Sequence, residues 1–199
     1  MGQRRKILFF NDMARKWTNS DRTEDLKKAE MELDLLDIRQ DSDVLDVGTG
    51  TGVLIPLLSN FTQEEKITAI DISRPMIDTA RKNFPNSQVN FILGDVLTHR
   101  FARSSFDFVI CYSVFPHFEN QRMAFQHLAG LLKPDGKITI MHSASRRYIN
   151  EMHGRKEPVK NDLLPSPEIL RKLVRKCRLK EEIMIDTSQM FMLAARKGR

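Results

Sequence analysis

A glycine-rich stretch next to an aspartate is the part of the sequence whose residue types and spacing point most directly to chemistry. Asp46 comes shortly before residues 48–52, which read Gly-Thr-Gly-Thr-Gly. Glycines let a backbone approach a ligand closely and adopt conformations that a Cβ opposes. If a helix follows, its N-terminus adds oriented N–H donors. The stretch therefore predicts a loop that binds a nucleotide-like cofactor, although several cofactors use loops of this kind.

Two further aspartates narrow the choice of cofactor. Asp71 and Asp95 each end a predicted strand. A carboxylate at the first position can bond ribose hydroxyls, and one at the second can accept from an exocyclic amine. The spacing G-x-G-x-G differs from the dinucleotide pattern G-x-G-x-x-G, and no Lys-Ser/Thr follows the loop as in a phosphate-binding P-loop. The carboxylate of Asp46 suits an ammonium group better than a pyrophosphate.

These aspartates need a scaffold in which strands and helices alternate. Short apolar runs predict seven strands, at 43–47, 67–72, 89–93, 106–112, 137–142, 179–185 and 190–195. Apolar spacing and capping residues predict helices at 6–17, from about 20 to before 41, and at 53–59, 73–84, 120–132 and 166–176, with a type I turn at 133–136. This alternation is typical of an α/β fold with a doubly wound, mostly parallel sheet and helices on both faces. Such sheets bind ligands beyond the carboxyl ends of their strands.

The length of 199 residues suits one domain. We divide it into an N-terminal helical cap (1–40), a cofactor-binding core (41–142), an insertion on the acceptor side (143–165), and a C-terminal helix with two strands (166–199). The sequence contains no apolar run long enough to predict a membrane span, and the apolar segment at residues 7–10 is too short for a signal sequence. We therefore expect a cytoplasmic protein. The two cysteines, Cys111 and Cys177, form no disulfide framework.

The formal net charge of +6 raises the question of a nucleic-acid partner. Basic residues concentrate at 4–6, 171–180 and 196–199. Acidic residues are interleaved throughout, and no aromatic stacking surface accompanies the basic segments. We therefore expect the basic residues to lie mainly on solvent-exposed helix faces and in a C-terminal tail. Nucleic acid is a possible partner that the sequence does not favour.

Five segments in order carry a resemblance to a known family. Residues 44–52, Asp71, 94–96, 106–109 and 131–137 are similar to the successive motifs of class I S-adenosylmethionine-dependent methyltransferases. The resemblance covers roughly residues 41–142. It implies a Rossmann-like fold, S-adenosylmethionine as cofactor and S-adenosylhomocysteine as product. The cofactor contacts that it implies are Asp46, Gly48, Thr49, Gly50, Asp71, Ile72, Met76, Asp95, Val96, Cys111 and, from the N-terminal helix, Trp17.

The methyl acceptor is less readable. Enzymes that methylate the exocyclic amines of nucleic-acid bases carry Asn/Asp-Pro-Pro-Tyr/Phe after the fourth strand, and residues 111–118 lack it. The region is more similar to small-molecule methyltransferases, including those of quinone biosynthesis, which favours a small-molecule acceptor with a reactive oxygen or carbon. His117 and His153 are the candidates for a catalytic base. The candidate acceptor contacts are Tyr112, Phe115, His142, Tyr148 and Asn150. The spacing of the histidines matches no known metal-ligand pattern, so no metal is expected.

Three other functions remain open. The basic balance would suit an RNA or protein methyltransferase. A nicotinamide-dependent oxidoreductase would use a similar fold, although the glycine spacing argues against it. A non-catalytic protein that binds S-adenosylmethionine would keep the same loop and aspartates. The sequence identifies neither the acceptor nor the oligomeric state.

Overall fold

Seven strands form one sheet in the computed structural model, which describes residues 2–18 and 22–198. The strands are β1 (Val44–Val47), β2 (Ile67–Asp71), β3 (Asn90–Leu93), β4 (Phe106–Tyr112), β5 (Leu132–His142), β6 (Leu179–Asp186) and β7 (Phe191–Lys197). Their order across the sheet is β3-β2-β1-β4-β5-β7-β6. All neighbours are parallel except β5 with β7 and β6 with β7. The predicted α/β fold with a mostly parallel sheet is confirmed.

The centre of the sheet is built from apolar runs that are buried on both faces. All four residues of β1 are buried, and so are six of the seven in β4. Strands of this kind are typical of parallel sheets that helices cover on both sides. The chain passes from β1 outward to β2 and β3, and then returns to place β4 on the other side of β1. The point where the order reverses, between β1 and β4, is where such sheets bind ligands.

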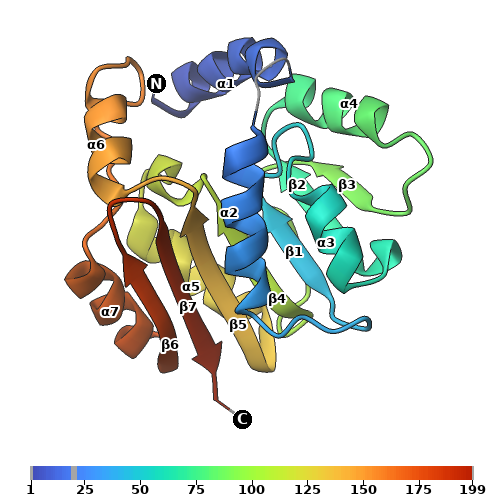
Figure 1. Ribbon diagram of the computed structural model, residues 1–199, viewed down its shortest axis with the longest axis vertical. Coiled ribbons are helices and arrows are strands. Elements are labelled where there is room, and N and C mark those ends of the chain that lie inside the picture. The colour runs from blue at the N-terminus through green and yellow to red at the C-terminus, as the bar shows by residue number, and fades with distance from the viewer. Residues whose placement is uncertain (1, 19–21, 199) are drawn as a thin grey trace.

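Helices cover both faces of this sheet. They are α1 (Gly2–Thr18), α2 (Thr23–Asp34), α3 (Ile55–Phe61), α4 (Arg74–Asn83), α5 (Gln121–Leu131), α6 (Arg146–Gly154) and α7 (Pro167–Lys176), with short 3-10 helices η1 (Glu64–Lys66) and η2 (Phe115–His117). Figure 1 shows α2 and α3 in front of the sheet and α5 behind it, while α1 crosses above the upper strand ends. Two apolar clusters fill the two interfaces, one beneath α2 and α3 and one beneath α5 and α7. Within the described ranges, no helix is both long and apolar enough to cross a membrane.

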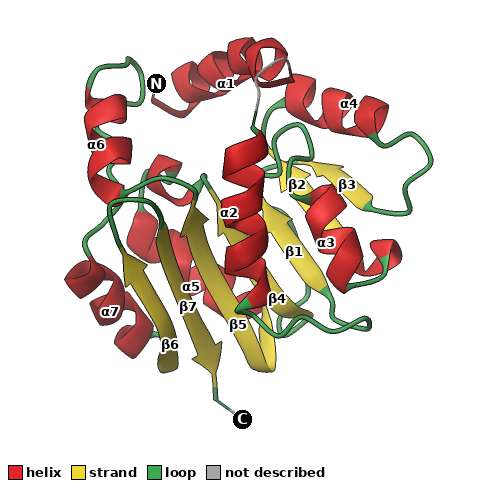
Figure 2. Cartoon of the chain, viewed as in Figure 1, coloured by secondary structure: helices red, strands yellow, loops and turns green. Residues whose placement is uncertain are grey.

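Side-chain caps are predicted at Asp21, Ser73 and Ser166, and the structure confirms the one at Ser73. The hydroxyl of Ser73 accepts from the backbone N–H of Met76, whereas Ser166 stands at the N-cap of α7 without a side-chain capping bond. The side chain of Asn120, which was not predicted as a cap, accepts from the backbone N–H of Met123 at the start of α5. The second helix starts later than expected, at Thr23, with Arg22 at its N-cap and no side-chain capping bond. Asp21, the predicted capping residue, lies outside the described residues. Figure 2 shows the alternation of helices and strands that these signals delimit.

The predicted turn at 133–136 lies inside a strand. Strand β5 begins at Leu132, which pairs with Phe106, and the next pair is Phe108 with Lys137. Five steps along β5 therefore correspond to two along β4, and the extra residues bulge out. Asp135 has a φ of +62°, which a type I turn does not contain. The cross-strand pair at Leu132 extends the strand beyond what the local turn residues indicate.

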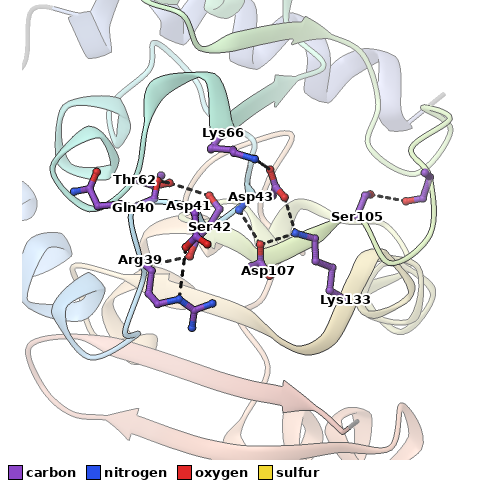
Figure 3. Close-up of polar contacts among 11 residues, drawn as sticks. Arg39, Gln40, Asp41, Ser42, Asp43, Thr62, Lys66, Ser105, Asp107 and Lys133 are labelled. Carbon is purple, nitrogen blue, oxygen red and sulfur yellow. Dashed lines mark hydrogen bonds and ion pairs between the residues drawn. The ribbon is translucent and has the colours of Figure 1, made fainter.

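A network of charged side chains lies at the starts of β1 and β4, at the end of the sheet opposite the glycine loop. The ammonium group of Lys133 lies 2.5 Å from a carboxylate oxygen of Asp43 and 2.7 Å from one of Asp107, and Lys66 lies 3.3 Å from Asp43 (Figure 3). The same Asp107 oxygen accepts from the backbone N–H of Asp43 at 2.8 Å. The network therefore ties the starts of β1 and β4 to the bulge that opens β5.

Replacing Lys133 by methionine is expected to lower the free energy of unfolding at pH 7 by about 1 kcal/mol, because it leaves two carboxylates facing each other. Burial alone would raise the pKa of Asp43, but Lys133 and Lys66 hold that pKa below its ordinary value of 3.8. A lowered native pKa stabilises the fold above about pH 4, and this stabilisation is lost as the pH falls through the native pKa. The effect of the substitution should therefore shrink in urea unfolding at pH 3.

The matched control for this experiment is Lys27→Met. Lys27 is exposed, and its nitrogen lies 4.0 Å from a carboxylate oxygen of Glu24. Exposed pairs of this kind contribute little, so unfolding should be unchanged. A Lys133→Met protein as stable as the parent at pH 7 would show that the network contributes nothing.

Candidate functional site

The glycine loop connects β1 to α3 and needs its glycines for two separate reasons. Gly48, Gly50 and Gly52 have φ values of +69°, +57° and +84°, which residues with a Cβ rarely adopt. A Cβ on Gly48 would also stand 2.4 Å from a methyl carbon of Val114. The loop is thereby able to lie directly against the residues that follow β4.

Backbone bonds fix the loop at the end of β2. The N–H groups of Gly48 and Thr49 donate to the carbonyl of Ile70 at 2.8 and 3.1 Å. The N–H of Gly50 donates to one carboxylate oxygen of Asp71 at 2.9 Å, and the N–H of Ser73 donates to the other at 2.8 Å. Asp71 therefore orders the loop and the start of α4 together.

A cavity of about 400 Å³ opens beside this loop. The structure brings five of the predicted cofactor contacts from the ends of β2 and β3 to its wall: Asp71, Ile72, Met76, Asp95 and Val96. The carboxylate of Asp95 accepts from the N–H of Leu97 at 2.9 Å, which orders the turn after β3. Apolar side chains and carboxylates thus line the same cavity. A nucleoside needs both, because its base has flat apolar faces and a polar edge.

A second cavity of about 390 Å³ lies on the other side of the loop. Asp46 and Thr49 line it, and Asp46 is almost completely buried. The Oδ2 atom of Asp46 makes no hydrogen bond to the described residues, although the neighbouring hydroxyl of Thr49 favours the ionised form of this carboxyl group. Burial raises the pKa of Asp46 to about 7, and the nearby charge of Asp71 adds to the rise. A buried carboxylate without a partner calls for a cationic or hydrogen-bonding group from a ligand.

His117 lies where the two cavities meet. Five residues line both spaces: Phe10, Gly48, Gly50, Ser113 and His117. The Nδ1 atom of His117 lies 2.8 Å from Oδ2 of Asp162, and its ring packs against the rings of Phe10 and His153 at centroid distances of 4.8 and 4.9 Å. The histidine is therefore held by the N-terminal helix and by the segment around α6.

Asp162 is the site residue that the sequence did not reveal. One carboxylate oxygen bonds His117, and the other lies 2.6 Å from the ammonium group of Lys6. The backbone carbonyl of Asp162 lies 2.6 Å from Nδ1 of His153. These partners are 9, 45 and 156 residues away, so no short motif joins them. The sequence indicated only that a polar stretch, residues 143–162, interrupts the alternation of strands and helices.

Helix α1 closes the site from above. Lys6 fastens one part of it to Asp162, and Asn11 accepts a hydrogen bond at 2.7 Å from the hydroxyl of Ser73 at the start of α4. Phe10 and Met13 lie on the same helix and line the second cavity. The contact predicted for Trp17 falls on a side chain outside the described part of the structure.

Several predicted acceptor contacts line the second cavity. Tyr112, His142, Tyr148 and His153 do so, and the hydroxyls of Tyr112 and Ser143 are 3.1 Å apart. Burial lowers the pKa of His142 to about 3, and its Nε2 has no hydrogen-bond partner among the described residues. His142 is therefore a neutral imidazole at physiological pH.

Three other predicted contacts lie outside both cavities. Cys111 and Phe115 belong to the apolar cluster beneath α5 and α7 and are fully buried. Side chains alternate along a strand, so Cys111 points to the opposite face of β4 from Tyr112. Asn150 exchanges two hydrogen bonds with the backbone of Leu164, at 3.1 and 2.7 Å, and so closes the segment after α6. Across the described residues, no group of three or more His, Cys, Asp or Glu side chains is arranged to hold a metal ion.

Comparison with known proteins decides which family uses this arrangement. Residues 45–140, from the first strand to the fifth, match the family model described as a methyltransferase domain. Over these residues, the chain is similar to a methyltransferase domain. The matched residues carry the glycine loop together with Asp46, Asp71 and Asp95.

Individual relatives and solved structures agree with this family. A malonyl-[acyl-carrier protein] O-methyltransferase of Acetivibrio thermocellus is 35% identical over 129 residues, which cover 64% of this chain and 45% of that one. An uncharacterized methyltransferase of Mycobacterium bovis is 32% identical over 98 residues, or 49% of each chain. The chain thus spans about half the length of the curated relatives it matches.

The fold is shared along almost the whole chain with solved structures of low sequence identity. A chain from the complex between the Haloferax volcanii Trm112 methyltransferase activator and a methyltransferase superposes with a TM-score of 0.80, at 17% identity, covering 96% of this chain and 98% of that one. A SAM-dependent methyltransferase from Aquifex aeolicus superposes with a TM-score of 0.72, at 18% identity, covering 94% and 97%. The methyltransferase fold therefore extends beyond the matched residues 45–140.

Proposed function

We propose that the protein binds S-adenosylmethionine across the glycine loop and transfers its methyl group to a small-molecule acceptor in the second cavity. The observation that carries this proposal is the buried carboxylate of Asp46, which lines the second cavity beside the glycine loop and has an oxygen without a partner among the described residues. The methionine end of the cofactor carries an ammonium group, the kind of cation that such a carboxylate attracts.

The nucleoside end of the cofactor fits the first cavity. The carboxylate of Asp71 would accept from the ribose hydroxyls while it keeps its bonds to the loop, since each oxygen has two lone pairs. Asp95 and the N–H of Val96 would bond the edge of the adenine, and Ile72 and Met76 would pack on its face. The sulfonium methyl would then lie between the two ends, close to the residues that line both cavities.

An oxygen atom is the acceptor atom that we favour. Among the relatives compared above, the one whose name states an acceptor is an O-methyltransferase. Residues of the second cavity include aromatic and apolar side chains from α1 and α6, among them Phe9, Met13, Ile149 and Met152. This lining suits a small, largely apolar acceptor better than a charged polymer.

Calorimetric titration tests the cofactor, and transfer of a labelled methyl group tests the reaction. S-adenosylmethionine and S-adenosylhomocysteine are expected to bind the purified protein, and NADH is not, because a pyrophosphate would face Asp46. Incubation with labelled cofactor and a fractionated small-molecule extract should label a low-molecular-weight product. Binding of NADH but not S-adenosylmethionine would contradict the proposal. Label in RNA or protein alone would contradict the acceptor class.

Affinity for S-adenosylmethionine should fall about tenfold from pH 8 to pH 6. Because burial raises the pKa of Asp46 from 3.8 to about 7, the free energy of unfolding falls between about pH 4 and pH 7, where the unfolded chain has lost this proton and the native protein keeps it, and the loss stays constant above pH 7. A bound ammonium group offsets that loss, so the cofactor binds the ionised form more tightly. Calorimetry across this range measures the effect, and the pH dependence should be weaker in Asp46→Asn, which removes this carboxyl group.

A further inference from the structure

The two cavities share one side chain that can move a proton. Of the five described residues that line both spaces, three are Gly48, Gly50 and Phe10, one is Ser113, and the fifth is His117. His153 and His142 line the second cavity but not the first. The meeting point of the cavities is where the nucleoside and amino-acid ends of the bound cofactor would join, and so where the methyl group is transferred.

Asp162 determines which nitrogen of His117 is free to accept a proton. A carboxylate only accepts hydrogen bonds, so the 2.8 Å contact places the proton of the neutral imidazole on Nδ1. The Nε2 atom then carries the lone pair. Burial alone would raise the pKa of Asp162, but its bonds to His117 and Lys6 hold the pKa below its usual range, so the group is a carboxylate at neutral pH.

The surroundings of His117 favour a neutral imidazole. Burial lowers the pKa of His117, and Asp162 opposes this decrease without cancelling it. The other charged or titratable groups that act on it are His153 of α6 and Lys6 of α1, and His142 at the end of β5 lies in the same cavity. An imidazole that is neutral at pH 7 is able to act as a base at the start of a reaction.

We infer that His117 is the general base of this protein, that Asp162 positions it, and that the acceptor is a weakly acidic hydroxyl group, phenolic or enolic, on a largely apolar small molecule. This inference rests on the proposed function and adds the base, the positioning residue and the acceptor class to it.

The proton and the electrons balance in one displacement. The acceptor oxygen forms a bond to the methyl carbon while the bond from that carbon to sulfur breaks, and the electron pair of the broken bond stays on sulfur. The hydroxyl proton passes to Nε2 of His117. The products are a methyl ether, the neutral thioether S-adenosylhomocysteine, and an imidazolium whose Nδ1–H still bonds Asp162. The imidazolium then loses its proton to water.

The base distinguishes between classes of acceptor. A carboxylate is already ionised at neutral pH and gains nothing from a neutral imidazole. A hydroxyl with a pKa near that of tyrosine, about 10, is almost entirely protonated and needs a base as it reacts. The wall of the second cavity formed by Phe9, Met13, Ile149 and Met152 favours a neutral, apolar molecule over an alkylammonium ion.

The first test needs neither cofactor nor acceptor. In long-range proton–nitrogen NMR spectra of the full chain, His117 is expected as the neutral Nδ1–H form with a pKa below 6.5, the ordinary value. Asp162→Asn should lower that pKa further, because the neighbouring negative charge is lost. An Nε2–H form in the parent protein, or a pKa that Asp162→Asn leaves in place, would overturn the positioning role.

The second test measures methyl transfer to a set of substituted phenols with pKa values from about 7 to 10, beside the matching benzoates and benzylamines. The phenols are expected to be methylated, and His117→Ala is expected to lower kcat about 100-fold or more while changing the affinity for S-adenosylmethionine less than threefold. Added imidazole should restore part of the kcat that His117→Ala loses. The ratio of the kcat of the parent to that of His117→Ala should be smallest for the most acidic phenol. Lys6→Met is the matched control for Asp162→Asn, since it removes the anchor of α1 but keeps the bond to His117.

Each outcome separates the inference from the proposed function. If the protein binds S-adenosylmethionine but methylates benzoates or benzylamines rather than phenols, the acceptor class is wrong. If it methylates phenols at the same rate after His117→Ala, the base is wrong. If Lys6→Met reproduces the kinetic effect of Asp162→Asn, Asp162 acts by docking α1. If the parent does not bind S-adenosylmethionine, the proposed function itself fails.

Discussion

Replacing Asp71 by alanine is expected to weaken S-adenosylmethionine binding at least 100-fold, about 3 kcal/mol. The substitution removes the predicted partner of the ribose hydroxyls. It also leaves the backbone N–H groups of Gly50 and Ser73, which donate to this carboxylate at 2.9 and 2.8 Å, without an acceptor. Hydrogen bonds to a charged group contribute about 1.5–3 kcal/mol each, so losing the ligand bond and the ordered loop together accounts for the decrease.

Calorimetry at pH 7.5 measures this effect, and two variants control for it. Asp78 is exposed on α4, seven residues further on, and lines neither cavity, so Asp78→Ala should bind like the parent. Asp71→Asn keeps one carbonyl oxygen as an acceptor and should fall between the two. An Asp71→Ala protein that is folded and binds S-adenosylmethionine normally would mean that the first cavity does not hold the ribose.

The Gly48→Ala substitution is expected to destabilise the protein by about 3 kcal/mol, which lowers Tm by roughly 6–12 °C for a chain of this size. The φ of +69° costs an alanine about 1–2 kcal/mol. The new Cβ would stand 2.4 and 2.8 Å from two side-chain carbons of Val114, and crowding of this kind adds about 1–3 kcal/mol. Any protein that still folds should bind S-adenosylmethionine poorly. The added Cβ would push the loop away from Val114 and into the space between the two cavities.

Two comparisons separate the causes of this destabilisation. Gly130 lies inside α5, and an added Cβ would stand no closer than 3.6 Å to the end of the Arg103 side chain, so Gly130→Ala should stabilise the helix by about 0.5–1 kcal/mol. Val114→Ala combined with Gly48→Ala removes the contact at 2.4 Å but keeps the Cβ of residue 114 at 2.8 Å and the strained φ, so it should recover less than half of the loss. Equal Tm values for Gly48→Ala and the parent would contradict the left-handed conformation of the loop.

The N-terminal and central parts of the fold could be predicted because their signals are local. Strand β4 has the bounds expected from its apolar run, and Ser73 caps the helix that it was expected to cap. The glycine loop and the aspartates that end β1, β2 and β3 were informative for the same reason. Each is read from a few consecutive residues, and parallel strands bring their carboxyl ends to one edge.

The direction in which a single side chain points could not be predicted from the sequence. Cys111 and Tyr112 are consecutive and were both proposed as contacts, yet the strand turns the first into the core and the second toward the second cavity. Asn150 and Tyr148 share α6, but Asn150 bonds the backbone of Leu164 whereas Tyr148 lines the cavity. Which face of an element meets a ligand depends on what packs against its other face, and that partner is distant in sequence.

By itself, the sequence determined the doubly wound sheet and the positions of the glycine loop and the three aspartates, since periodicity, capping and glycine spacing act over a few residues. The tertiary structure decided which side chains meet around the second cavity. Only the folded chain brings Lys6 and Asp162, 156 residues apart, into contact, and places His117 between two cavities with its Nδ1 held by the same carboxylate. Contacts of this range are set by the packing of α1 and the segment after α6 over the sheet, and no local pattern encodes them.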